Sequence, residues 1–229
     1  MRLGLRFFAS CYLRVRVDGA DLLPDEPYLI CFSHPSWLDP VLVVGFWPDR
    51  RWVFIFGPRE DDMLVGGRNL LIRWARLGVP FRPSKDDLLD TTRRAVSVFR
   101  DGHLLAVAGE GRLSDRDGAI VPLQDGPAFF ALRGQVPIVP LAVIGTQWVW
   151  FGKRITLRIG APVGTRGRRA DRATVAAVTR ETQAALEGLL VGVEPDPPPG
   201  RVGRWLSEVF NERPWLLQDE AAVVEHEKL

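Results

Sequence analysis

The chain has 229 residues, a length that suits one domain with an appendage and is too short for two domains of ordinary size. Hydrophobic residues make up 46% and charged residues 25%, which excludes disordered, collagen-like and low-complexity proteins because there is ample apolar surface to bury. The net charge is only +2, but the basic residues are 27 Arg and only 3 Lys. Arginine suits the binding of anionic head groups, and the base composition of the genome explains such an excess equally well.

The cysteine, histidine and charge patterns limit the classes of protein further. Cys11 and Cys31 form neither a disulfide framework nor a metal cluster, so we expect a reducing, cytoplasmic setting. His103 and His226 have no partners at metal-ligand spacing, and we expect no metal. The arginines are spread among 28 acidic residues, which argues against a nucleic-acid partner. No apolar run approaches the roughly 18 residues that cross a bilayer.

In chain order, residues 1–16 combine arginines with Leu3, Leu5, Phe7 and Phe8 and predict an amphipathic segment that lies on a membrane surface. Short apolar runs bounded by turn residues then predict buried strands. Longer periodic stretches predict helices between them, one of them with Ser84 as its N-cap. The strands are expected at 28–33, 51–56, 104–108, 138–144 and 155–159, and the helices at 61–77, 84–101, 126–133 and 171–191. This alternation predicts an α/β domain with ligands at the strand ends.

The domain is expected to span residues 17–192. Residues 194–200 contain four prolines, which neither a helix nor a central strand accommodates, so 193–200 is predicted to be a linker. Residues 201–229 are expected to form a C-terminal appendage, a helix followed by an acidic tail. Its apolar stripe fits packing on the parent core or contact with a membrane.

His34 and Asp39, separated by four residues after a predicted strand, are the strongest candidates for chemistry. Histidine exchanges protons near neutral pH, and a carboxylate on its far nitrogen fixes the tautomer and stabilises the imidazolium. In a straight helix the two side chains would point about 140° apart. Pro35 and Pro40 disfavour helix at the residues before them, so we expect both side chains at the ends of one tight turn. An N-cap aspartate beside a polar loop histidine is the structural alternative.

Three later segments add candidates for phosphate or lipid binding. Arg82 follows a strand-like piece and precedes a helix N-terminus, so it suits a phosphate, although it also fits a surface loop. Glu110, Gly111 and Arg112 follow a predicted strand in a glycine-rich loop that suits a phosphate or a plain turn. Residues 136–141 form a proline-bracketed apolar strand that fits a pocket wall or the core.

In order and spacing, these four segments resemble the boxes of the glycerolipid acyltransferase family, which includes lysophosphatidate acyltransferases. The resemblance runs from about residue 17 to residue 163, where Gly160-Ala161-Pro162 is similar to the terminal strand of the family. It implies a single α/β domain with a central mixed sheet covered by helices. It also implies that His34 is the general base, that Asp39 orients it, and that Arg82, Glu110, Gly111 and Arg112 bind a phosphate-bearing acceptor.

The resemblance further implies an O-acyltransferase of phospholipid biosynthesis that needs no cofactor. The donor would be an acyl thioester, either acyl-CoA or acyl-ACP, which makes acyl carrier protein a candidate partner. The acceptor would be a lysolipid, with 1-acylglycerol 3-phosphate the first choice. Such an enzyme would sit peripherally on the inner face of the membrane, with Trp148, Trp150 and Phe151 as a second contact. Backbone N–H groups of the His34 turn are expected to hold the oxyanion.

Several alternatives remain open at the level of sequence. The chain has Ser33 and Gly109 where the family commonly has Asn and Pro, and such departures leave the acceptor open, including a non-glycerolipid one. A non-catalytic lipid-binding protein with the same fold would not need His34 and Asp39 together. A covalent relay through Cys31 and a serine esterase built on Ser36 are weaker options, because a strand cysteine is usually a core residue and no nucleophile elbow surrounds the serine.

Overall fold

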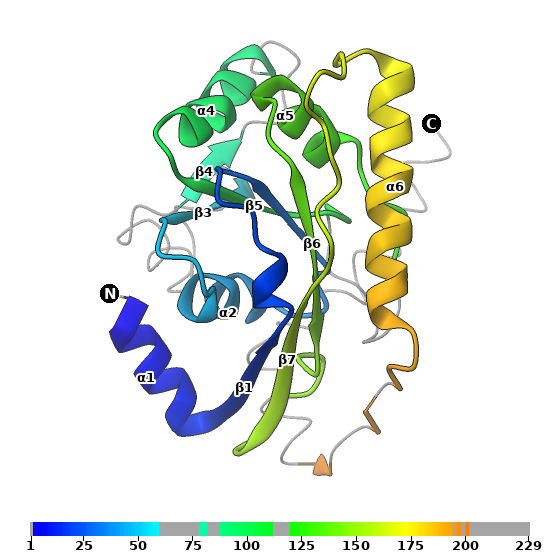
Figure 1. The fold of residues 1–229 in the computed structure, drawn as a ribbon. Coiled ribbons are helices and arrows are strands. Elements are labelled where there is room, and N and C mark those ends of the chain that lie inside the picture. Colours follow the sequence, from blue (N-terminus) through cyan, green and yellow to red (C-terminus); the bar gives the residue numbers. More distant parts are fainter. Residues whose placement is uncertain are drawn as a thin grey trace, which may run out of the picture.

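The computed structural model describes residues 2–59, 78–81, 88–111, 120–194, 196–197 and 200–201. Within these ranges, seven strands form one sheet in the order β1-β7-β6-β2-β5-β3-β4 (Figure 1). The strands are β1 Leu13–Asp18, β2 Leu29–Phe32, β3 Val53–Arg59, β4 Gly78–Phe81, β5 Leu104–Ala108, β6 Ile138–Ile144 and β7 Lys153–Ile159. The helices are α1 Arg2–Tyr12, α2 Asp39–Phe46, α4 Leu88–Arg100, α5 Gly126–Gly134 and α6 Arg172–Leu190, with a short 3₁₀ turn, η1, at Ala20–Leu22.

The direction of the strands determines which loops come together. Strands β6, β2, β5, β3 and β4 are parallel to one another, so all five end at the same edge of the sheet, which we call the carboxyl edge. Strand β7 is antiparallel to β6, and β1 is parallel to β7, so these two strands begin at the carboxyl edge. The sheet is therefore mixed, as expected, and the carboxyl edge is where ligands bind in such folds.

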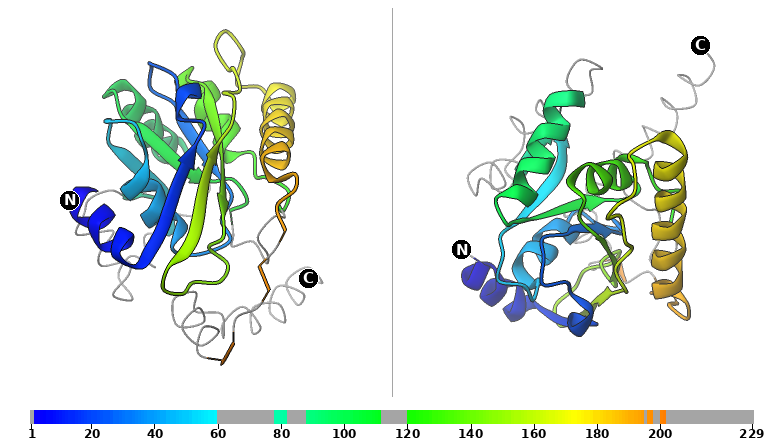
Figure 2. Two further views of the ribbon diagram at one scale, coloured as in Figure 1. Left: turned by 60° about the horizontal axis from the view of Figure 1, so that its bottom comes forward. Right: turned by 45° about the horizontal axis from the view of Figure 1, so that its top comes forward.

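Helices cover both faces of the sheet, as Figure 2 shows. Ile30 and Phe32 of β2 pack into the core on the side of α1 and α2. Leu29 and Cys31 pack into the core beside α4, α5 and α6. A strand that is buried on both faces needs an unbroken apolar run, which explains the composition of β2.

Most expected elements are confirmed, and the differences have physical reasons. The expected bounds 104–108 and 138–144 are those of β5 and β6. Helix α2 was not expected, because its apolar residues surround it on all sides and give no amphipathic period. Asp39 begins this helix rather than preceding it, since proline is well tolerated in the first turn. Strand β1 begins at Leu13, so residues 13–16 belong to the sheet and not to the N-terminal segment.

Several expectations fall outside the described residues. They are the helix at 61–77, the N-cap at Ser84, and the appendage beyond residue 201. The linker is described in part, and its Asp196 forms an ion pair with the buried Lys153 at the start of β7. No helix in the described ranges is long and apolar enough to cross a membrane.

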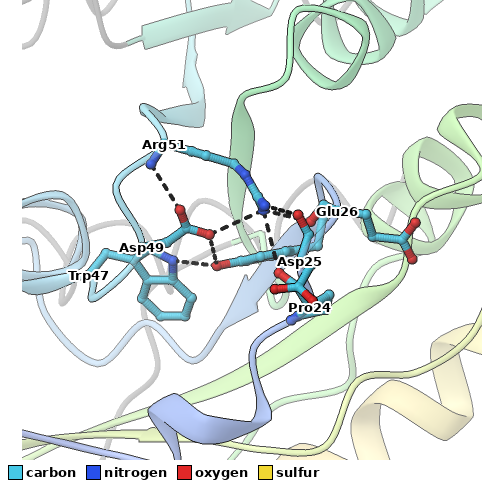
Figure 3. Close-up of polar contacts among 7 residues, drawn as sticks. Pro24, Asp25, Glu26, Trp47, Asp49 and Arg51 are labelled. Atoms are coloured by element: carbon cyan, nitrogen blue, oxygen red, sulfur yellow. Dashed lines mark hydrogen bonds and ion pairs between the residues drawn. The ribbon is translucent and has the colours of Figure 1, made fainter.

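A polar network joins the far ends of β2 and α2, away from the carboxyl edge (Figure 3). Tyr28, fully buried just before β2, accepts a hydrogen bond of 2.9 Å from the Trp47 indole at the end of α2. Its hydroxyl donates to Asp49 over 2.9 Å. Arg51 bonds Asp49 and reaches the carbonyl groups of residues 24–26. These bonds join the start of β2 to the end of α2, on the side opposite to the candidate site.

Candidate active site

The contact between His34 and Asp39 lies at the carboxyl edge. His34 follows β2 by two residues and Asp39 begins α2, so the turn between strand and helix brings the two side chains together. Nδ1 of His34 lies 3.0 Å from Oδ2 of Asp39. The same oxygen accepts a hydrogen bond of 2.7 Å from the backbone N–H of Ser36. The contact expected from the spacing is therefore present.

The imidazole of His34 is held by its neighbours. The residue is 8% exposed, and its ring lies edge-on to Phe32 and Trp37 with centroid distances of 5.7 and 5.8 Å. Because Nδ1 faces a carboxylate, the tautomer with a proton on Nδ1 is favoured. The other nitrogen, Nε2, is then the basic atom that can accept a proton from a substrate.

The carboxyl group of Asp39 is fully buried, and burial raises its pKa. Hydrogen bonds from His34 and the Ser36 amide, the charge of His34 and the neighbouring Thr146 hydroxyl lower the pKa but do not overcome burial. Keeping this group ionised therefore costs stability. Such buried and perturbed carboxylates are concentrated at functional sites.

Glu110 connects the loop after β5 to the His34 turn. It is 2% exposed, and its Oε1 accepts a hydrogen bond of 3.3 Å from the backbone N–H of His34. Its Oε2 accepts a bond of 3.4 Å from the N–H of Val121. Gly111 follows with a φ of 67°, a left-handed conformation that favours glycine, and donates its N–H to Ala108. Glu110 thus positions the histidine backbone, and its role toward substrate stays a prediction.

The two arginines expected to bind phosphate, Arg82 and Arg112, lie outside the described residues. Their neighbours in sequence, Phe81 and Gly111, belong to segments that leave the sheet at the carboxyl edge. The roles of both arginines therefore stay predictions.

Two departures from the family pattern have structural roles. Ser33 accepts a hydrogen bond of 2.9 Å from the N–H of Val143, which ties the end of β2 to β6. Gly109 donates its N–H to the carbonyl of Phe32 over 3.0 Å, a bond that proline could not make. A Cβ at Gly109 would lie 2.7 Å from Sγ of Cys31, so the close packing here requires glycine. Both residues attach the His34 turn to the neighbouring strands.

Four of the N–H groups in the His34 turn have partners inside the protein, and the expected oxyanion site in this turn stays a prediction. The N–H groups of Ser36, Leu38 and Asp39 donate within the turn, and that of His34 donates to Glu110. These four groups are therefore already bonded inside the protein.

The alternative nucleophiles are poorly placed. Ser36 is fully buried, and its hydroxyl accepts the N–H of Leu38. Burial raises the pKa of Cys31 to about 12, and its side chain lies in the core on the face opposite to Phe32. Neither residue resembles an exposed, activated nucleophile.

Sequence reasoning missed Thr146, a fully buried residue that follows β6 at the carboxyl edge. Its hydroxyl lowers the pKa of the Asp39 carboxyl. Its signal was a polar residue directly after a buried strand. That is the same signal that identified His34 and Glu110.

The acyltransferase family matches residues 14–144, more than half of the chain. This chain belongs to the acyltransferase family. The match includes β2, the His34 turn and the loop with Glu110, which are the elements that build the site. The resemblance recognised from the four sequence segments is confirmed.

Similar proteins include 1-acyl-sn-glycerol-3-phosphate acyltransferase alpha of Mus musculus, 26% identical over 171 residues that cover 69% of this chain and 58% of the relative. The Bos taurus protein of the same name is 27% identical over 183 residues, covering 75% of this chain and 62% of the relative. The chain thus spans about three fifths of the length of these curated relatives.

A solved structure confirms the fold class. The 1-acyl-sn-glycerophosphate (LPA) acyltransferase PlsC of Thermotoga maritima superposes with a TM-score of 0.61 over 82% of this chain and 76% of its own. At 22% sequence identity this likeness concerns the fold alone.

Proposed function

We propose that this chain is an O-acyltransferase that moves a fatty acyl group from acyl-CoA or acyl-ACP to the hydroxyl of a lysophospholipid. The observation that carries the proposal is the 3.0 Å contact between His34 and Asp39, buried at the carboxyl edge and inside the family match. The names of the mouse and bovine relatives support 1-acylglycerol 3-phosphate as acceptor and a role in phospholipid biosynthesis.

In the proposed reaction, Nε2 of His34 accepts the proton of the acceptor hydroxyl while the oxygen of that hydroxyl attacks the carbonyl carbon of the thioester. A C–O bond forms, and the carbonyl oxygen becomes the oxyanion of a tetrahedral intermediate. The C–S bond then breaks, and the leaving thiolate takes up the proton from the imidazolium. A thioester is already activated, so no nucleophile of the protein is needed.

The remaining predicted residues either hold His34 in position or bind the acceptor. Asp39 orients His34 and stabilises the imidazolium, and Glu110 fixes the histidine backbone. Arg82 and Arg112 bind the acceptor phosphate, since a guanidinium fork matches phosphate oxygens, and Gly111 lets the loop approach this group closely.

The test is turnover by the purified protein with acyl-CoA or acyl-ACP and a panel of lysolipids and other alcohols, followed by mass spectrometry. We expect acylated 1-acylglycerol 3-phosphate, and a loss of about 10²- to 10⁴-fold in His34→Ala. His103→Ala is the matched control, because His103 precedes β5 at the opposite edge of the sheet and should be dispensable. Binding of lysolipid without turnover would instead favour the non-catalytic alternative, and an acylated alcohol of another class would favour the non-glycerolipid acceptor.

We also propose that the protein attaches to the inner face of the cytoplasmic membrane near this site. Phe151, 74% exposed, lies in the loop between β6 and β7 and contacts Tyr12 at the end of α1 with a centroid distance of 5.8 Å. Phe7 on α1 is 67% exposed. Arg14 and Arg154, both exposed, are partners in the register of β1 and β7. Exposed aromatic and cationic groups at one edge suit an anionic bilayer.

Flotation with vesicles that contain anionic lipid tests this attachment. Binding should fall in high salt and weaken in Phe7→Glu, Phe151→Glu and a variant that lacks residues 1–12. Trp52→Glu is the control, because Trp52 is 47% exposed but precedes β3 at the opposite edge. Full-length protein that stays in solution at low salt would contradict attachment and favour a soluble acceptor.

A further inference from the structure

Two buried polar atoms at the site lack a hydrogen-bond partner. Among the described residues, they are Oδ1 of Asp39 and the hydroxyl oxygen of Thr146, and both residues are fully buried. The two groups are neighbours, since the Thr146 hydroxyl is among those that act on the Asp39 carboxyl. Their geometry falls outside that of a hydrogen bond. Buried polar atoms are nearly always paired, so two unpaired ones on neighbouring groups indicate a bond that forms in another state of the site.

The backbone holds Thr146 in this position. Gly145 has a φ of 90°, which turns the chain at the end of β6. A Cβ at Gly145 would lie 2.7 Å from the backbone oxygen of Arg154, so this turn has no room for another residue. Strand β6 pairs directly with β2, which ends before His34. Thr146 is therefore fixed beside the catalytic pair by the sheet itself.

We propose that Thr146 is a positioning residue that acts through Asp39, donating its hydroxyl hydrogen bond to Oδ1 while Ser36 and His34 hold Oδ2. A rotation about the Cα–Cβ bond of Thr146 changes the direction of this hydroxyl. With both oxygens bonded, the carboxylate keeps its charge and its orientation as His34 takes up the proton. The consequence for catalysis rests on the proposed function, whereas the bond itself does not.

In the described part of the chain, few charged groups surround Asp39, so the pH dependence of stability can test the proposed hydrogen bond. His34 is the charged group that affects the pKa of Asp39, and the carboxylate of Glu110 accepts the backbone N–H of His34. A hydroxyl donor stabilises the ionised carboxylate more than the protonated form. Removal of the donor should therefore raise the pKa of Asp39 further, so that more of this group is protonated at a given acidic pH.

The experiment compares Thr146→Val, which removes the hydroxyl at nearly constant size, with Thr146→Ser, which keeps it. Unfolding in urea is followed at several pH values between 8 and 5, in the natural chain and in an Asp39→Asn background. The control is Thr182→Val, because Thr182 is 2% exposed and its hydroxyl already donates to Val178 within α6. We expect the urea midpoint of Thr146→Val to fall more at pH 8 than at pH 5. This pH dependence should vanish in the Asp39→Asn background, where the charge at this position is absent.

Activity gives the second readout. In Thr146→Val we expect turnover to fall about tenfold, the low end for partners that orient a catalytic group, and its acid limb to move to higher pH. Thr146→Ser should restore both. A midpoint change that is equal at all pH values and in both backgrounds, as expected for Thr182→Val, would overturn the proposal. If Thr146→Val does not fold, Thr146→Ala carries the same expectations. Absence of turnover in the natural chain would refute the proposed function and leave the urea test valid.

Discussion

Replacement of Asp39 by Asn separates the charge of this residue from its hydrogen bonds. Oδ2 accepts bonds from His34 and from the Ser36 N–H, so an amide oxygen placed there keeps both. An asparagine that presents its NH₂ group to a histidine selects the wrong tautomer and costs about 10⁴-fold. Here the Ser36 N–H selects the oxygen. We therefore expect a smaller loss of turnover, about 10²-fold, from the missing charge alone.

Stability should change in the opposite direction. Burial raises the pKa of Asp39, so the folded state favours the protonated form more than the unfolded state does. The natural chain therefore loses stability as the pH rises through the folded pKa, and Asn has no charge to bury. Asp39→Asn should be more stable than the natural chain at pH 8. This advantage should shrink as the pH falls toward about 4, the usual aspartate pKa.

Asp171→Ala provides a control of opposite sign. Asp171 caps α6 and accepts a bond of 2.8 Å from the N–H of Thr174, which lowers the pKa of its carboxyl. This variant should be less stable than the natural chain at neutral pH, with a difference that is lost as the pH falls through the lowered pKa, and its turnover should be unchanged. Urea unfolding across pH and acyl transfer assays measure both effects. An Asp39→Asn protein with full turnover, or with lower stability at pH 8, would refute the reasoning.

Three further predictions concern other parts of the site and its support. Tyr28→Phe leaves the Trp47 N–H and the Asp49 carboxylate without this partner and should lower the unfolding free energy in urea by about 1–3 kcal/mol. Cys31→Ala should keep its turnover per folded molecule, since no thioester relay passes through a buried thiol; loss of turnover in a folded variant would revive the relay. Arg82→Lys and Arg112→Lys should raise the KM for a phosphate-bearing acceptor and leave the donor KM unchanged, whereas the reverse would indicate a neutral acceptor.

The sheet was predictable where burial leaves a clear pattern. Strands β2, β5 and β6 lie in the centre, and their unbroken apolar runs mark them in the sequence. Strand β1 lies at the edge and alternates as Leu13, Arg14, Val15, Arg16 and Val17, a pattern of period two. Its arginines and its position beside an amphipathic helix favoured a membrane segment. Residues 13–16 form a strand because they pair with β7, which is far away in the sequence.

The site was predictable where its geometry is local. His34 and Asp39 are joined by one turn, so spacing and prolines were enough to bring them together. The contacts of Glu110 with the His34 amide and of Thr146 with Asp39 depend on which strands are neighbours. Strand order is a property of the whole chain and is not encoded near either residue. Sequence alone also could not show that the N–H groups of Ser36, Leu38 and Asp39 donate within the turn.

Contacts at both ends of the β2–α2 unit hold the His34–Asp39 pair in place, although burial disfavours the ionised carboxylate. At the carboxyl edge, His34 and Asp39 join the strand to the helix through a buried carboxylate whose ionised form burial disfavours. At the other end, Trp47 donates a hydrogen bond to Tyr28, which links the helix to the strand there as well. Preorganised polar groups need no rearrangement during the reaction. The distant network thus helps to maintain the geometry in which, in the proposed reaction, His34 accepts a proton.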